Sequence, residues 1–167
     1  MDLIVEPAAW ARWDARRMRC ALGRAGIRVG KTEGDGTTPA GAFVMRRALY
    51  RADRGAPPPT TRLPVTPIVA ADGWCDDPAA AAYNRPVTLP YRARAEPLWR
   101  ADRLYDLVVV LGYNDDPVIA GAGSAIFLHV ASPDYAPTEG CVALAPDDLR
   151  RVLAEADAAS RVVVNPG

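Results

Sequence analysis

The stretch that decides the fold is residues 124–144, S-A-I-F-L-H-V-A-S-P-D-Y-A-P-T-E-G-C-V-A-L. An apolar run leads into His129, the only histidine of the chain, and a second apolar run follows Cys141. A polar loop marked by prolines separates the two residues. The pattern predicts strand, loop, strand, with His129 ending the first strand and Cys141 starting the second. We expect these strands to be antiparallel neighbours, which brings both side chains to the same end of a sheet.

A cysteine near a histidine is the arrangement that nucleophilic catalysis by a thiol requires. An imidazole can take the thiol proton, and the imidazolium then stabilises the thiolate. Gly140 lets the backbone turn sharply and lets a substrate approach. The N–H groups of Gly140 and Cys141 could face a developing oxyanion. The alternative is a core cysteine and a structural histidine, because each residue type alone is often buried for packing.

Two motifs resemble the YkuD-type L,D-transpeptidase catalytic domain. That family carries a histidine and, after a loop, Ser/Thr-His-Gly-Cys. In this resemblance His129 matches the upstream histidine, Thr138 the Ser/Thr, and Gly140 and Cys141 the final pair. Upstream, K-T-E-G-D-G-T-T-P-A-G-A-F at 31–43 resembles the family's Thr-Pro-x-Gly-x-Phe segment with its lead-in. The resemblance places that segment against the catalytic centre.

The chain departs from the family pattern in the second motif. Glu139 stands where the family usually has a second histidine, and Ala143 stands where a polar residue often follows. The loop between His129 and Cys141 is also shorter than is usual. These differences concern the acceptor substrate more than the Cys–His chemistry.

The resemblance implies a cysteine acyltransferase whose partners are donor and acceptor peptide stems of peptidoglycan. Cys141 would attack the carbonyl of an L-centre-to-D-residue bond, and His129 would pass the thiol proton to the departing D-amino acid. An amine of a second stem would resolve the thioester. A carbapenem should also acylate Cys141. No metal or organic cofactor is implied. Substrate contacts are assigned to Thr138, Glu139, Tyr113, Tyr135 and Arg85.

Two other functions remain open on the same scaffold. With water as the acceptor, the protein would be an L,D-carboxypeptidase that trims tetrapeptides, for example in recycling. With an inert Cys141, it would be a non-catalytic wall-binding module. A thiol that reacts with iodoacetamide faster than Cys20 or Cys75 would favour the enzymes, because activation requires a low thiol pKa.

Composition excludes several classes of protein. The 20 basic and 20 acidic residues cancel, whereas nucleic-acid binding needs a basic excess. No apolar run is long enough to span a membrane, and residues 1–5 do not make a signal peptide. The resemblance favours the periplasm or cell envelope, and a cytoplasmic location is the alternative. The length predicts one domain over 1–167.

The two remaining cysteines, Cys20 and Cys75, allow two interpretations. They could form a disulfide, which would favour an oxidising compartment, or remain two buried thiols. The sequence alone does not decide between them.

Residues 23–32, G-R-A-G-I-R-V-G-K-T, nearly match a phosphate-binding loop. The first glycine of that motif should stand at Ala25. The helix that should follow is interrupted by Gly34, Gly36 and Pro39. Nucleotide binding is therefore not favoured.

Strand signals dominate the chain. The strongest is 104–111, a β-branched run expected to form a central strand. A single helix is expected from Pro146, with an apolar stripe at Leu149, Val152, Leu153 and Ala156. The remaining strands are expected at 3–5, 18–22, 42–50, 63–70 (at an edge) and 161–165. The class is therefore mainly β, and the resemblance specifies a mixed β-sheet sandwich with the helix packed on it.

Two regions are less regular. Residues 7–17, with Trp10 and Trp13 three apart, fit either a helix face or a turn followed by a strand. Residues 72–94 are loop-like and are expected to carry substrate contacts. Arg85, Arg92 or Arg94 could bind a peptide carboxylate there.

Overall fold

Fourteen β-strands and one α-helix form the part of the chain that the computed structural model describes, residues 1–166. The mainly β class with one helix is as expected from the sequence. The strands are β1 (Asp2–Glu6), β2 (Trp10–Trp13), β3 (Arg16–Ala21), β4 (Ile27–Arg28), β5 (Thr38–Pro39), β6 (Gly41–Tyr50), β7 (Val65–Pro67), β8 (Asp72–Cys75), β9 (Pro86–Thr88), β10 (Ala95–Pro97), β11 (Leu107–Leu111), β12 (Phe127–Val130), β13 (Val142–Leu144) and β14 (Arg161–Val164). The helix α1 spans Pro146–Glu155, and a short 3-10 helix spans Ala52–Arg54.

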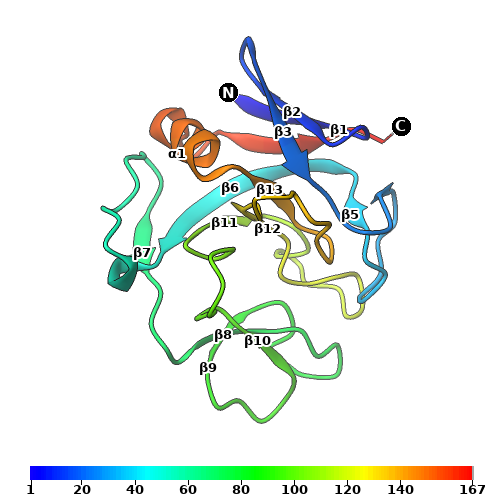
Figure 1. The fold of residues 1–167 in the computed structure, drawn as a ribbon. Coiled ribbons are helices and arrows are strands. Elements are labelled where there is room, and N and C mark those ends of the chain that lie inside the picture. Colours follow the sequence, from blue (N-terminus) through cyan, green and yellow to red (C-terminus); the bar gives the residue numbers. More distant parts are fainter. Residues whose placement is uncertain (167) are drawn as a thin grey trace.

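Eight of the strands form a closed, barrel-like sheet rather than the plain sandwich that the resemblance specified. The order is β11-β12-β13-β3-β2-β1-β14-β6, and β6 pairs again with β11. Closure depends on the ten residues of β6, whose first part pairs with β14 and whose second part pairs with β11. Figure 1 shows β6 as the long curved strand across the molecule. As expected, β7 lies at an edge, where it pairs with β6.

Residues 7–17 form a β-hairpin, not a helix. In the paired strands β2 and β3, Trp10 and Trp13 point to opposite faces because their spacing is odd. Trp13 enters the core and donates from Nε1 to Glu155 of α1 at 2.8 Å. Trp10 stays at the surface, where the Arg17 guanidinium lies 4.0 Å from its ring centroid. The helical spacing of the two tryptophans was therefore coincidental.

The helix α1 begins at Pro146, as predicted, and its apolar stripe is buried. Leu149, Val152 and Leu153 are inaccessible and belong to the same core cluster as Leu3 and Leu128. Two acidic residues in the first turn suit the positive end of the helix. The helix thus lies against the barrel core and packs on the sheet as expected.

Residues 72–94 contain more regular structure than predicted. Together with β10 they form a small sheet in the order β10-β8-β9, which lies beyond β11 and β12 in Figure 1. Its Trp74 packs edge-on against Phe127 at 5.1 Å between ring centroids. A second core cluster, which includes Trp74, Leu98, Tyr105, Val108 and Phe127, joins this sheet to the barrel.

All three cysteines are free, so the described residues contain no disulfide between Cys20 and Cys75. Cys20 lies in the barrel core, and Cys75 is inaccessible on β8. The interpretation as two buried thiols is therefore correct. No helix among residues 1–166 is both long and apolar enough to cross a bilayer.

Candidate active site

The strands of His129 and Cys141 are neighbours, but they are parallel rather than antiparallel. Their register pairs Leu128 with Val142 and His129 with Ala143. The loop between them crosses back before β13 because it docks on the chain that follows β3: Thr138 N–H donates to Leu22 O at 2.9 Å. The sequence predicted antiparallel neighbours, and this docking of the loop accompanies the parallel pairing instead.

The parallel register still places His129 and Cys141 on one face. Leu128 and Val142 point into the barrel core. Because side chains alternate along a strand, the adjacent residues His129 and Cys141 point outward. Both outward-facing residues line one cleft of about 570 Å³. Four segments of the chain bound the cleft. Its lining includes Lys31, Glu33, Arg100, Tyr105, Ser124, Ala125, His129, Thr138, Glu139, Gly140 and Cys141.

Cys141 is held as a protonated thiol. Its side chain belongs to a residue only 8% exposed. Sγ donates to Ala125 O at 3.2 Å and accepts from Phe127 N–H at 3.3 Å. Burial, followed by the charge of Glu96, raises the pKa of the Cys141 thiol to about 12, while the Phe127 N–H and then Lys31 act in the opposite direction. The thiol therefore needs a base and a nearby positive charge before it can act as a nucleophile.

His129 is held as a neutral imidazole. Burial lowers its pKa to about 4. Nδ1 lies 2.9 Å from Val130 O, and a carbonyl can only accept, so Nδ1 carries the proton. This leaves Nε2 as the proton acceptor of the ring. The ring also packs edge-on against Tyr105, with 5.3 Å between centroids. The site thus contains a base of fixed tautomer, although the resting thiol is bonded to Ala125 instead.

Gly140 has a different role from the one its sequence position suggested. Its φ is +147°, and a Cβ there would lie 2.8 Å from Thr37 O and 3.2 Å from Lys31 Nζ. The missing side chain therefore makes room for the 31–38 loop of the protein rather than for a substrate. The Gly140 N–H donates to Thr138 Oγ1 at 3.1 Å, and that hydroxyl donates to Cys141 O at 2.6 Å.

The predicted substrate-binding residues divide into two groups. Thr138 and Glu139 line the cleft, and the Glu139 side chain, 81% exposed, pairs with Arg24 at 3.0 Å on the rim. The other three do not line this cleft. Tyr113 packs edge-on against a phenylalanine and donates to a backbone carbonyl. Tyr135 lies under an arginine on the outer face, and Arg85 lines a separate hollow.

Sequence reasoning missed Asn84, which holds the backbone of Ala125, the residue whose carbonyl accepts from the Cys141 thiol. Its buried amide oxygen accepts from Ala125 N–H at 3.0 Å and from Trp74 Nε1 at 2.9 Å. Its Nδ2 donates to the carbonyls of Tyr113 and Asn114. Ala125 has a φ of +52°, and its carbonyl is the acceptor for the thiol. No local signal could identify Asn84, because its partner Ala125 is 41 residues away.

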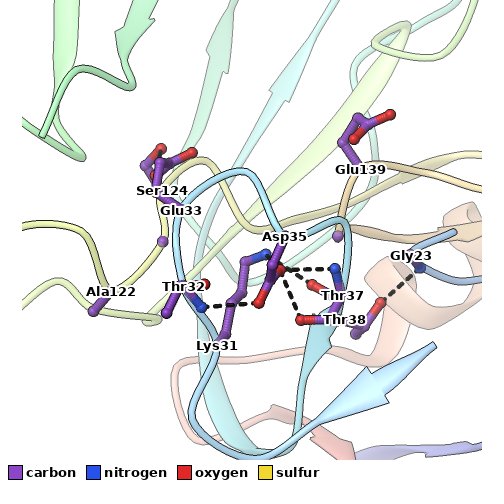
Figure 2. Close-up of polar contacts among 12 residues, drawn as sticks. Gly23, Lys31, Thr32, Glu33, Asp35, Thr37, Thr38, Ala122, Ser124 and Glu139 are labelled. Carbon is purple, nitrogen blue, oxygen red and sulfur yellow. Dashed lines mark hydrogen bonds and ion pairs between the residues drawn. The ribbon is translucent and has the colours of Figure 1, made fainter. Parts of the chain in front are cut away.

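Glu33, a second missed residue, is a carboxylate on the cleft wall. Its Oε2 accepts from Tyr83 at 2.5 Å and from Ser124 at 2.7 Å. Figure 2 shows Glu33 and Ser124 side by side beyond the Lys31–Asp35 pair. The sequence feature that could have identified Glu33 is its position in the 31–43 motif, because part of that motif lines the cleft. Within residues 1–166, no group of three or more His, Cys, Asp or Glu is placed to hold a metal ion.

Comparisons with known proteins add a family match. The model of the YkuD family, described as the L,D-transpeptidase catalytic domain, matches residues 10–164. No curated protein sequence matches the chain. Among solved structures, the helical cell shape determining protein Pgp2 from Campylobacter jejuni is similar at 14% identity and a TM-score of 0.49, over 98% of this chain and 46% of that one. An L,D-transpeptidase from Mycobacterium smegmatis is similar at 13% identity and a TM-score of 0.44, over 99% and 58%. The chain thus spans about half the length of these two proteins.

Proposed function

The chain belongs to the L,D-transpeptidase catalytic domain family, and we propose that it transfers an acyl group between peptidoglycan peptide stems through Cys141. The observation that carries the proposal is the shared outward face of β12 and β13. It brings the Cys141 thiol and the neutral His129 imidazole to the lining of one cleft. A nucleophile and a base beside one cavity are the two groups that acyl transfer needs.

In the proposed first half-reaction, the thiol proton moves to Nε2 of His129 while the thiolate attacks the donor carbonyl. The new C–S bond gives a tetrahedral oxyanion. We assign the Cys141 N–H, on the residue that carries the sulfur, as a donor to this oxyanion. The Gly140 N–H can donate to the oxyanion as well only if its hydrogen bond to Thr138 Oγ1 breaks. When the C–N bond breaks, the imidazolium returns the proton to the departing D-amino acid.

In the proposed second half-reaction, an amine of another stem attacks the thioester. His129 takes a proton from that amine, the C–S bond breaks, and the proton returns to the Cys141 sulfur. We assign Glu139 to the approach of the acceptor, because an exposed carboxylate on the rim attracts a cationic amine. Water in place of the amine would make the same site an L,D-carboxypeptidase. Because the proposed substrate is peptidoglycan, we assign the activity to the cell envelope or to the recycling of peptidoglycan fragments.

The test is mass spectrometry of disaccharide-tetrapeptide after incubation with the protein, with Cys141→Ala and Cys75→Ala alongside. Cys75→Ala removes a buried thiol that does not line the cleft, and it should retain the activity. Cross-linked dimers that only Cys141→Ala loses would support the transpeptidase. Tripeptide and free D-amino acid without dimers would identify the carboxypeptidase. Products that persist in Cys141→Ala, or none in any sample, would contradict the proposal.

A further inference from the structure

Lys31 is the only lysine of the chain, and it is buried beside the cleft. Its side chain is 3% exposed. Nζ donates to Asp35 Oδ1 at 2.7 Å and to Thr37 O at 2.9 Å. Figure 2 shows the Lys31 side chain running up through the 31–38 loop to meet Asp35. A buried ammonium is costly unless it is paired, so this arrangement needs an explanation.

Asp35 holds that ammonium in place. Its carboxylate also accepts from Thr32 N–H at 2.9 Å, from Thr37 N–H at 2.9 Å and from Thr37 Oγ1 at 2.8 Å. Burial acts to raise the pKa of Asp35, but Lys31 and the threonine donors outweigh it and hold the pKa well below its usual range. Asp35 is therefore a carboxylate at neutral pH, and its oxygen is the ion-pair partner of Lys31 Nζ.

The ammonium lies directly behind the nucleophile's backbone. Nζ is 3.2 Å from the point where a Cβ on Gly140 would stand, and Thr37 O is 2.8 Å from the same point. Lys31, Gly140 and Cys141 all line the cleft. Gly140 therefore provides the space that brings a fixed positive charge close to Cys141.

The chemistry of the site requires such a charge. Moving the thiol proton to His129 creates a negative sulfur in surroundings that disfavour it, because burial and then the charge of Glu96, which lines the same cleft, both raise the thiol pKa. Of the two cations that act to lower that pKa, Lys31 has the stronger effect. The other, Arg100, is bound through two nitrogens to Asp102 at 2.9 Å and 2.6 Å.

We propose that Lys31, fixed by Asp35 behind Gly140, is a positioning residue that stabilises Cys141 as the thiolate. It makes no bond to the substrate; the thiol proton goes to Nε2 of His129, and the ammonium lowers the free energy of the ion pair so formed. This role rests on the proposed function, in which Cys141 is the nucleophile. It also gives a use to the segment Gly30-Lys31-Thr32, after which the chain forms a loop and the strands β5 and β6 rather than a helix.

The experiment measures the rate of Cys141 alkylation by iodoacetamide against pH, read by peptide mass spectrometry. The folded protein is compared with Lys31→Gln, Lys31→Arg, Asp35→Asn and the control Arg62→Gln, which removes an exposed cation paired with Asp157. Lys31→Gln should raise the apparent pKa of the thiol by about one unit. Lys31→Arg and Arg62→Gln should leave it nearly unchanged.

The direction in which Asp35→Asn shifts the thiol pKa distinguishes an electrostatic role of Lys31 from a purely structural one. The substitution removes the opposing negative charge, so the thiol pKa should fall, opposite to the effect of Lys31→Gln. A purely structural role predicts that both variants loosen the same loop and shift the profile in the same direction, which would overturn the proposal. Unshifted profiles with lowered melting temperatures would overturn it as well. Should Lys31→Gln not fold, the sign of the Asp35→Asn shift alone decides.

The two proposals fail separately, because alkylation needs no peptidoglycan. A shifted thiol pKa with no product from muropeptides contradicts only the proposed function. Cross-linking that depends on Cys141, with unshifted profiles, contradicts only the role of Lys31.

Discussion

Replacing Asn84 with alanine should cost the protein a large part of its stability. The side chain makes four hydrogen bonds, at 2.8–3.0 Å, to Ala125, Trp74, Tyr113 and Asn114. At about 1 kcal/mol net for each bond, their loss destabilises the fold by about 4 kcal/mol. Asn84 also has a φ of +55°, where alanine is less favourable than asparagine by up to about 1 kcal/mol.

The measurement is thermal and urea unfolding followed by circular dichroism. For a chain of this size, a loss of about 4–5 kcal/mol lowers the melting temperature by about 8–20 °C. Asn165→Ala, at an exposed asparagine beyond the end of β14, is the control and should change the unfolding free energy by less than about 0.5 kcal/mol. Asn84→Asp is informative as well, because it keeps an acceptor for Ala125 but faces two carbonyls without a donor.

The reasoning would be refuted by an Asn84→Ala protein within about 1 kcal/mol of the parent. It would also be refuted if Asn84→Asp were as stable as the parent, because the two donated bonds would then contribute nothing.

Two further predictions concern the cleft. Gly140→Ala should lower the unfolding free energy by about 2–4 kcal/mol, from a strained φ and a clash with Thr37 O. Gly55→Ala, with positive φ but open space around it, should lose only about 1 kcal/mol in the same urea titration, and equal losses would contradict the clash. For His129, burial lowers the pKa to about 4, so the unfolded chain binds more protons between pH 6.5 and 4. Stability should therefore fall as the pH drops through this window, by at most about 3 kcal/mol. His129→Gln should lack this part of the slope, and identical pH curves for the two proteins would count against a buried neutral imidazole.

Local signals predicted much of the fold and part of the site. The β-branched run predicted at 104–111 and the strand leading into His129 were visible as continuous apolar runs, and the apolar stripe of α1 was visible as a period of 3.6 residues. The Gly-Cys pair and the 31–43 motif were visible as residue types in order. The small sheet of β8, β9 and β10 was not, because its strands have only three or four residues between turns.

Three features depended on contacts between distant segments. Tyr113, Tyr135 and Arg85 looked suitable for binding, but packing directs them away from the cleft. Asn84 binds Ala125, which contacts the Cys141 thiol, from 41 residues away in the sequence. Gly140 was expected to let a substrate approach, but the group that lies against it is the protein's own 31–38 loop.

The sequence by itself determined the mainly β class, the single helix and the presence of one histidine and one Gly-Cys on consecutive strands. Only the tertiary structure decided that β12 and β13 are parallel, that the sheet closes through β6, and that a buried ammonium lies behind Cys141. The physical reason is that alternation of apolar residues sets which face of a strand is buried. It does not set the direction of the neighbouring strand, because parallel and antiparallel ladders bury the same face. That direction follows from the sum of distant contacts, such as Thr138 with Leu22 and Lys31 with Asp35.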